Sequence, residues 1–170
     1  MRILLDKNAV RRWFESILNT NTGTPPTEEQ ESVLTTLAAF RSQGAEIYIT
    51  LETYNILTHI IRNPPITRAI IANVEVLFPS EPFRKWLKLL TGTTTLTRED
   101  AKILAYGSFG TNISRTILGA NRVLTLDKGL EAEFHRNKSG LKERLRVLTR
   151  GLPPPYDEAE LPETVLIEAE

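Results

Sequence analysis

The sequence contains no cysteine, only two histidines and no long apolar run. Without cysteine the chain has neither disulfide bonds nor thiolate metal sites. No apolar stretch approaches the roughly 18 residues that a membrane-spanning helix needs, and the first five residues, followed directly by an aspartate, are too short for a signal peptide. His59, beside apolar neighbours, and His135, in a basic run, are expected to be structural or surface residues. These absences favour a cytoplasmic protein that is not inserted in a membrane.

The length and composition fit one globular domain with a sizeable core, since 41% of the 170 residues are hydrophobic and 25% are charged. The formal net charge is zero, but the charges are unevenly distributed. Residues 151–170 contain six acids and neither Lys nor Arg, so residues 1–150 have a net charge of +6. A basic body suits a polyanionic partner, although +6 is also ordinary for a domain of this size.

Short apolar runs alternate with helix patterns along the chain. We expect strands at residues 3–5, 45–50, 122–126 and 144–149, while residues 74–78 fit either a strand or a helix end. Apolar residues three and four positions apart predict helices between them. This order predicts an α/β fold, with three α/β/α layers and a mainly parallel central sheet of about five strands.

The end of the chain differs from the rest in composition. Gly151 and the prolines that follow it close the expected fold, so residues 1–152 are predicted to form one domain. Residues 153–170 are predicted to form an acidic, proline-rich and flexible tail. An alternative is that this tail folds over the basic body and competes with a polyanionic ligand.

Four carboxylates occupy related positions in this arrangement. Asp6, Glu52 and Asp127 each follow a predicted strand, and Asp100 lies in the first turn of a predicted helix. The carboxyl ends of parallel strands share one edge of a sheet, so these side chains are expected to meet there. At about 5 Å and an effective dielectric near 20, each ionised pair costs on the order of 3 kcal/mol. A cation is needed to neutralise them, and oxygen-only ligands favour Mg²⁺ or Mn²⁺.

Each of these acids also has a purely structural explanation. Asp6 can cap the helix that follows it, and Glu52 can complement the dipole of the next helix. Thr97-Arg-Glu-Asp100 is a capping-box pattern, and Asp127-Lys-Gly is an ordinary turn. Because an acid in a first turn can both complement a helix and bind a metal, the two explanations do not exclude each other.

Several short motifs occur in a characteristic order between residues 1 and 150. They are Leu4-Leu5-Asp6-Lys7-Asn8, Glu52, Asp100-Ala-Lys-Ile-Leu-Ala105, Val123-Leu-Thr-Leu-Asp127-Lys128 and Arg146-Val-Leu-Thr149. Taken together, they make the chain resemble the PIN domain, a metal-dependent ribonuclease fold that includes many bacterial toxins of toxin–antitoxin pairs. The chain departs from the small toxins in its longer spacing between Asp100 and Asp127.

The resemblance implies a nuclease that uses Mg²⁺ or Mn²⁺ to cut single-stranded or structured RNA. It implies that the metal ligands and catalytic residues are Asp6, Glu52, Asp100 and Asp127. It also implies that Asn8 and Thr125 support the pocket by hydrogen bonds. An antitoxin protein and a second copy of the chain are the other partners that it suggests.

Other functions compete with this interpretation. A catalytically silent PIN-like domain would bind RNA or a protein without turnover. A haloacid-dehalogenase phosphatase needs Asp-x-Asp after its first strand, and this chain has Asn8 in place of the second Asp. A phospho-receiver needs paired acids after its first strand, and this chain lacks them. Both functions are therefore disfavoured. If RNA is the ligand, the basic residues expected to contact phosphate are Arg11, Arg12, Lys128, Arg136, Lys138, Lys142, Arg144 and Arg146.

Overall fold

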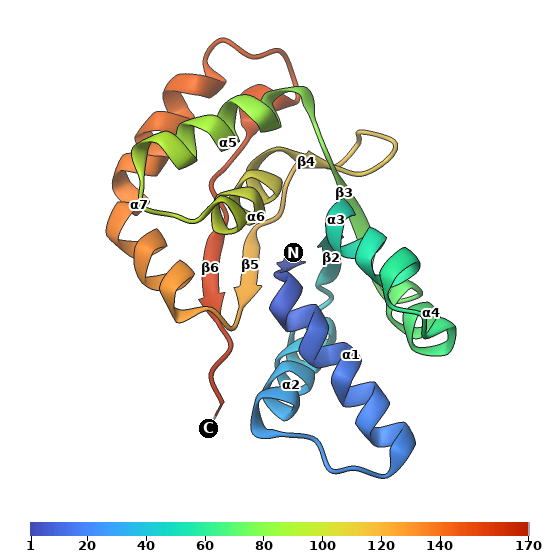
Figure 1. Ribbon diagram of the computed structural model, residues 1–170. Helices are drawn as coiled ribbons and strands as arrows, with labels where there is room; N and C mark the ends of the chain where they lie inside the picture. Colours follow the sequence, from blue (N-terminus) through green and yellow to red (C-terminus); the bar gives the residue numbers. More distant parts are fainter. Residues whose placement is uncertain (170) are drawn as a thin grey trace.

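A six-stranded sheet runs through the molecule in the order β4-β3-β2-β1-β5-β6 (Figure 1). The computed structural model describes residues 1–169. Its strands are β1 (Arg2–Leu5), β2 (Glu46–Thr50), β3 (Glu75–Pro79), β4 (Gly110–Thr111), β5 (Arg122–Thr125) and β6 (Glu163–Leu166). Every neighbouring pair is parallel except β3 and β4, which are antiparallel. The ambiguous segment at residues 74–78 is therefore mainly strand.

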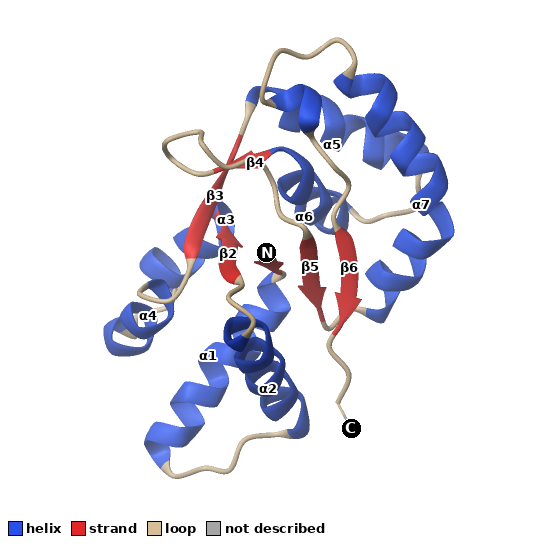
Figure 2. Ribbon diagram, turned by 180° about the vertical axis from the view of Figure 1, so that it is seen from behind, coloured by secondary structure: helices blue, strands red, loops and turns tan. Residues whose placement is uncertain are grey.

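Helices cover both faces of this sheet (Figure 2). They are α1 (Lys7–Thr22), α2 (Glu28–Ser42), α3 (Leu51–Asn55), the π-helix η1 (Ile56–Ile60), α4 (Pro64–Ile71), α5 (Glu81–Thr93), α6 (Arg98–Phe109), α7 (Lys128–Thr149) and the 3-10 helix η2 (Tyr156–Glu158). Within residues 1–169, none of the helices combines the length and apolar character needed to cross a membrane.

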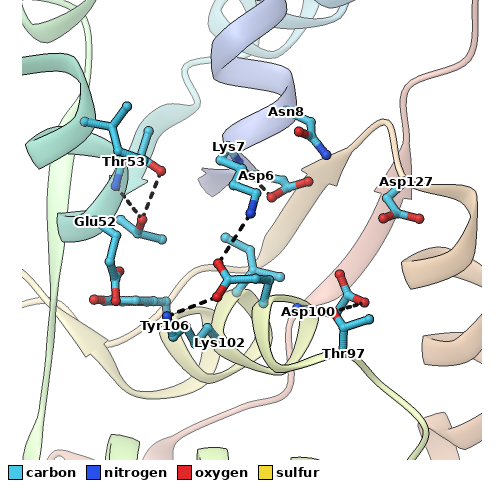
Figure 3. Close-up of a pocket in the computed structure, with 14 residues that line it drawn as sticks. Asp6, Lys7, Asn8, Glu52, Thr53, Thr97, Asp100, Lys102, Tyr106 and Asp127 are labelled. Atoms are coloured by element: carbon cyan, nitrogen blue, oxygen red, sulfur yellow. Dashed lines mark hydrogen bonds and ion pairs between the residues drawn. The ribbon is translucent and has the colours of Figure 1, made fainter. Parts of the chain in front are cut away.

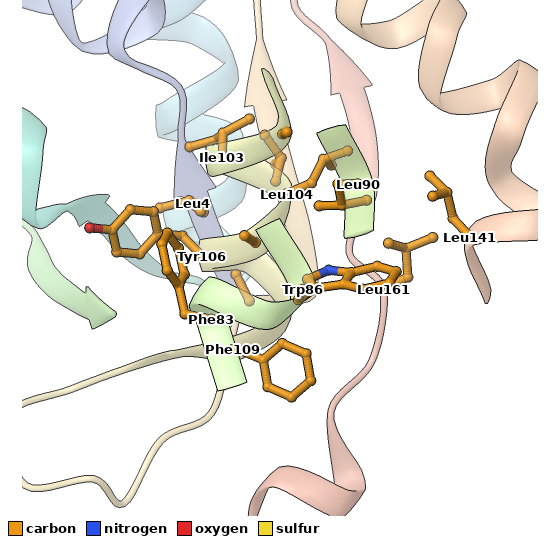
Figure 4. Close-up of a cluster of buried hydrophobic side chains, with 14 of the residues drawn as sticks. Leu4, Phe83, Trp86, Leu90, Ile103, Leu104, Tyr106, Phe109, Leu141 and Leu161 are labelled. Carbon is orange, nitrogen blue, oxygen red and sulfur yellow. The ribbon is translucent and has the colours of Figure 1, made fainter. Parts of the chain in front are cut away.

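The first strand shows why the fold has three layers. Ile3, Leu4 and Leu5 are all fully buried, and successive side chains of a strand point to opposite faces. Ile3 and Leu5 belong to a core cluster with apolar residues of α1, α2 and α4. Leu4 belongs to a second cluster that includes Trp86 of α5 and residues of α6 and α7 (Figure 4). The predicted three-layer α/β/α arrangement around a mainly parallel sheet is confirmed.

The prediction of a last strand at residues 144–149 is wrong, because these residues form the end of α7. The buried apolar positions of α7 are Leu130, Phe134, Leu141, Leu145 and Leu148. Their spacings of three, four and seven residues form one helical stripe. Val147 is exposed on the outer side of the helix. Leu145 and Val147 alternate with Arg144 and Arg146 in the sequence, and this alternation suggested a strand.

The strand at the far edge of the sheet comes instead from the segment predicted to be a flexible tail. β6 pairs in parallel with β5, and the flanking Leu161 and Ile167 are buried. The Glu163 carboxylate forms an ion pair with Lys138 of α7, so part of the acidic charge is neutralised against the basic body. Residues 163–166 therefore belong to the sheet, and the predicted domain boundary at residue 152 leaves this strand out. Glu170 lies outside the described residues.

A close approach of backbone segments brings β5 to the end of α6. Gly119 has a φ of +59°, and a Cβ atom there would lie 2.2 Å from the Gly107 carbonyl oxygen. The next residue, Ala120, donates its N–H to that same oxygen at 2.8 Å. Only glycine fits this conformation and this contact at position 119. The junction holds α6 and β5 side by side, which brings Asp100 and Asp127 to the same part of the molecule.

Candidate functional site

A pocket of about 320 Å³ lies at the carboxyl ends of β1, β2 and β5. Asp6, Glu52, Asp100 and Asp127 all line it, together with Asn8 (Figure 3). The four acids come from separate parts of the sequence and meet only because the strands are parallel. The structure therefore brings the predicted site residues to one place, although not all of them to one side of it.

Four helices begin at this pocket, and each is capped by a residue that lines it. Asp6 accepts a hydrogen bond from the Lys7 N–H at 2.7 Å, and Asp127 accepts from the N–H groups of Gly129 at 2.7 Å and Leu130 at 3.1 Å. Thr50 and Thr97 cap α3 and α6 in the same way. The structural explanations for the acids therefore hold, and the positive ends of the helix dipoles offset part of their negative charge.

Thr125 connects two of the four acids. Its hydroxyl donates to Oδ2 of Asp6 at 3.1 Å and accepts from the N–H of Asp127 at 3.0 Å. Thr125 is fully buried, so this geometry is held by the surrounding core. Asn8, on the first turn of α1, lines the pocket but forms no side-chain hydrogen bond within residues 1–169.

The Asp6 carboxylate lies in an environment that opposes its ionisation. Burial raises the pKa of Asp6 above its ordinary value, and the charge of Asp100 raises it further. The hydrogen bonds from Thr125 and the Lys7 backbone, and the Lys7 charge, act in the opposite direction. A cation bound near Asp6 and Asp100 would stabilise both ionised carboxylates.

Glu52 stands apart from the three aspartates. Figure 3 shows it across the pocket from Asp127 and beside Tyr106. Burial raises the pKa of the Tyr106 hydroxyl, and hydrogen bonding to Glu52 and its charge raise it further. Glu52, an exposed residue of α3, is therefore tied to the opposite wall of the pocket.

The acids of the pocket determine whether a divalent cation fits there. All candidate donors are carboxylate oxygens, which is the ligand type that Mg²⁺ and Mn²⁺ prefer. Among residues 1–169, however, no group of three acidic or histidine side chains is close enough to hold one ion. Mg²⁺ usually retains several waters and uses only one or two carboxylates. The donor chemistry thus fits such an ion, with Asp6 and Asp100 as the pair whose charges interact.

Two lysines in the same pocket received no role from the sequence. Lys7 Nζ lies 3.4 Å from Oε2 of Glu99, and Lys102 Nζ lies 3.2 Å from Oε1 of the same residue. The hydrogen bond from Lys102 is the main cause of the lowered pKa of Glu99. Glu99 and Lys102 are three residues apart on a predicted helix, which was the available signal. The pocket thus holds cations that can contact a phosphate as well as acids.

Most of the basic residues predicted to contact phosphate are already paired. Within the described chain, Arg11, Arg136 and Arg146 form ion pairs with nearby acids of their own helices. Lys138 and Lys142 both pair with Glu163 of β6. These pairs reduce the charge available to RNA on the outer face of α7.

No protein-family model matches the chain, no curated protein matches its sequence, and no solved structure matches its fold. The resemblance to the PIN domain consequently depends on the quoted motifs alone. Any function must be argued from the pocket itself.

Proposed function

We propose that this chain is a PIN-like, Mg²⁺- or Mn²⁺-dependent endoribonuclease of the cytoplasm. The supporting observation is that Asp6, Glu52, Asp100 and Asp127, selected from the sequence as metal ligands and catalytic residues, line one pocket. The pocket lies where parallel sheets commonly bind their ligands, beyond the carboxyl ends of the strands. Its all-oxygen acids suit a hard divalent cation, and its lysines suit a phosphate.

The residues divide into complementary roles under this proposal. Asp6 and Asp100 would hold the ion together with water, Asp127 would contribute through water, and Thr125 keeps Asp6 and Asp127 in place. When bound, such an ion lowers the pKa of a coordinated water and polarises the phosphate. Lys7 and Lys102 bind the phosphate oxygens. Glu52, across the pocket, orients water or accepts a proton.

The first prediction concerns cleavage of a fluorescent single-stranded RNA with added Mn²⁺. We expect wild type to cut it, and Asp6→Asn and Asp127→Asn to lose more activity than the roughly 10- to 100-fold typical of outer-shell residues. Asn caps a helix as well as Asp does, so the variants keep their folds. Asp157→Asn, an exposed acid of η2, is the matched control with wild-type activity. Equal rates for wild type and Asp6→Asn would overturn the proposed mechanism.

The observation that no three acids within residues 1–169 gather around one point favours a second candidate, a catalytically silent domain that binds RNA or protein. It predicts RNA binding without cleavage in Mg²⁺ or Mn²⁺. An antitoxin partner and a homodimer stay predictions, which co-purification and the measured solution mass test.

A further inference from the structure

An apolar groove of about 480 Å³ adjoins the carboxylate pocket on the side of α1 and η1. Its floor is lined by Val10, Phe14, Ile56, Leu57 and Ile61. Charged side chains border it, namely Lys7, Arg11 and Glu15. The groove therefore combines an apolar floor with a polar rim, a combination typical of small-molecule sites.

The groove and the carboxylate pocket are neighbours. Lys7, Asn8, Thr53 and Ile56 line both of them. A ligand with one group in the carboxylate pocket can thus place a neighbouring group in the groove. Lys7 lies at the junction with a half-exposed side chain, where it can reach an anionic group that connects the two parts.

The charges on the rim favour an anionic ligand. Arg11 is strongly exposed and pairs with Glu15 at 2.8 Å. Lys7 shares the single carboxylate of Glu99 with Lys102, so these three side chains keep one net positive charge beside the groove. A nucleic acid matches this combination, because its bases are flat rings with apolar faces that are carried on a sugar-phosphate chain. In a duplex the rings are stacked and paired, so only an unpaired nucleotide can place its base in the groove.

One wall of the groove includes an irregular helix. At Ile56 the helical α3 passes into the π-helix η1, and Ile56 and Leu57 of this segment both line the groove. Short π-helical turns are rare and occur frequently at functional sites, which agrees with a binding role for this segment.

We propose that this groove binds one unpaired base of an RNA strand whose phosphate lies in the carboxylate pocket. The identification of the strand as RNA rests on the proposed function. The groove selects single-stranded over double-stranded substrate, and Lys7 contacts the phosphate between the two subsites.

The test compares two fluorescent probes in EDTA, so that binding is measured without cleavage. One is a dodecamer of uridylate, and the other is a ribose-phosphate backbone of equal length without bases. Wild type is expected to bind the uridylate at least about fivefold more tightly, because a base held on an apolar or aromatic surface contributes at least this factor. Ile56→Asn, and Ile61→Gln as a second variant, are expected to bind both probes alike.

Leu18→Asn is the matched control, since Leu18 is 38% exposed and Ile56 is 36% exposed, and Leu18 lines neither cavity. It should keep the wild-type preference for bases. The proposal is overturned if wild type shows no such preference, if neither probe binds, or if the folded groove variants retain the preference. A partner polypeptide as the true occupant would give the first or second of these results.

The outcomes separate this proposal from the nuclease itself. If wild type cleaves RNA but shows no preference for bases, the proposed nuclease function is supported and the proposed base site is contradicted. If the preference depends on Ile56 but the protein cuts no RNA with any metal, the base site is supported and the nuclease function is contradicted.

Discussion

Asp6 illustrates how one side chain serves both the helix and the pocket. It caps α1, and its burial raises its pKa, so a carboxylate is a costly choice for a cap that asparagine could also provide. The sequence could predict Asp6 as a candidate ligand because a buried apolar strand precedes it. The resemblance implied that Thr125 supports the pocket by hydrogen bonds, but the sequence did not reveal that its partner is Asp6, which lies 119 residues away.

The second prediction concerns the thermal stability of Asp6→Asn. In EDTA its melting temperature should equal or exceed that of wild type, because the cap remains and a buried charge is removed. Mn²⁺ at about ten times its dissociation constant should stabilise wild type by about 1.4 kcal/mol, or about 3–6 °C, and should not shift the variant. Differential scanning fluorimetry measures both values. The same Mn²⁺ shift in both proteins would contradict a metal site at Asp6.

The third prediction concerns the buried hydroxyl of Thr125. Thr125→Val keeps the shape but removes hydrogen bonds to Asp6 and Asp127, so it should lower the free energy of unfolding by about 1–3 kcal/mol. Thr164→Val is the matched control, because the buried Thr164 hydroxyl has no hydrogen-bond partner among residues 1–169. Urea unfolding of both variants tests this, and equal effects would show that the hydrogen bonds of Thr125 contribute nothing.

At the scale of elements, the sequence predicts a strand correctly where one short apolar run forms a buried strand. The strands predicted at residues 3–5, 45–50 and 122–126 match β1, β2 and β5 to within one residue at either end. It fails at α7 and β6, where two rules compete. Residues 144–149 alternate like a strand yet continue a helical stripe, and β6 has only four residues within an acidic segment. For α7 the helical stripe prevails, because Leu145 and Leu148 are buried. For β6 the pairing with β5 decides, and no local pattern reveals that contact.

The fourth prediction concerns the contact between β6 and α7. The hydrogen bond from Lys138 is the main cause of the lowered pKa of Glu163. Its contribution to stability is therefore present above the ordinary pKa of 4.5 and is lost as the pH falls through the lowered pKa of the folded state. Because Glu163 is partly exposed, Glu163→Gln should cost only about 0.5–1 kcal/mol at neutral pH, and less near pH 3. Urea unfolding at both pH values measures this, with Glu158→Gln as control.

At the scale of the whole molecule, the position of the site was more predictable than its details. Parallel strands place their carboxyl ends at one edge whatever their exact register, so acids that follow separate strands meet there. Distances between side chains depend on caps, rotamers and helix positions, which the sequence does not specify. Glu99, which bridges Lys7 and Lys102 at the pocket, depends on such details and was missed.

The distribution of charge over the molecule leads to the last prediction. Glu163 of β6 pairs with Lys138 and Lys142 on α7, two of the residues that the sequence suggested as RNA contacts. Lys7 is paired in a similar way with Glu99, but it lines both the pocket and the groove, whereas Lys142 lines neither. RNA bound at the pocket should contact Lys7 and leave Lys142 uncovered.

The salt dependence of binding distinguishes the two lysines. Each phosphate contact to single-stranded nucleic acid contributes about 0.7 to the slope of log K against log salt concentration. For the uridylate dodecamer in EDTA, Lys7→Met should reduce the slope by about this amount and Lys142→Met should leave it unchanged. Fluorescence anisotropy over a series of KCl concentrations measures both slopes. The opposite result is a reduced slope for Lys142→Met and an unchanged slope for Lys7→Met. It would show that RNA binds on the outer face of α7 and not at the pocket, and it would contradict the assignment of the pocket as the nuclease site.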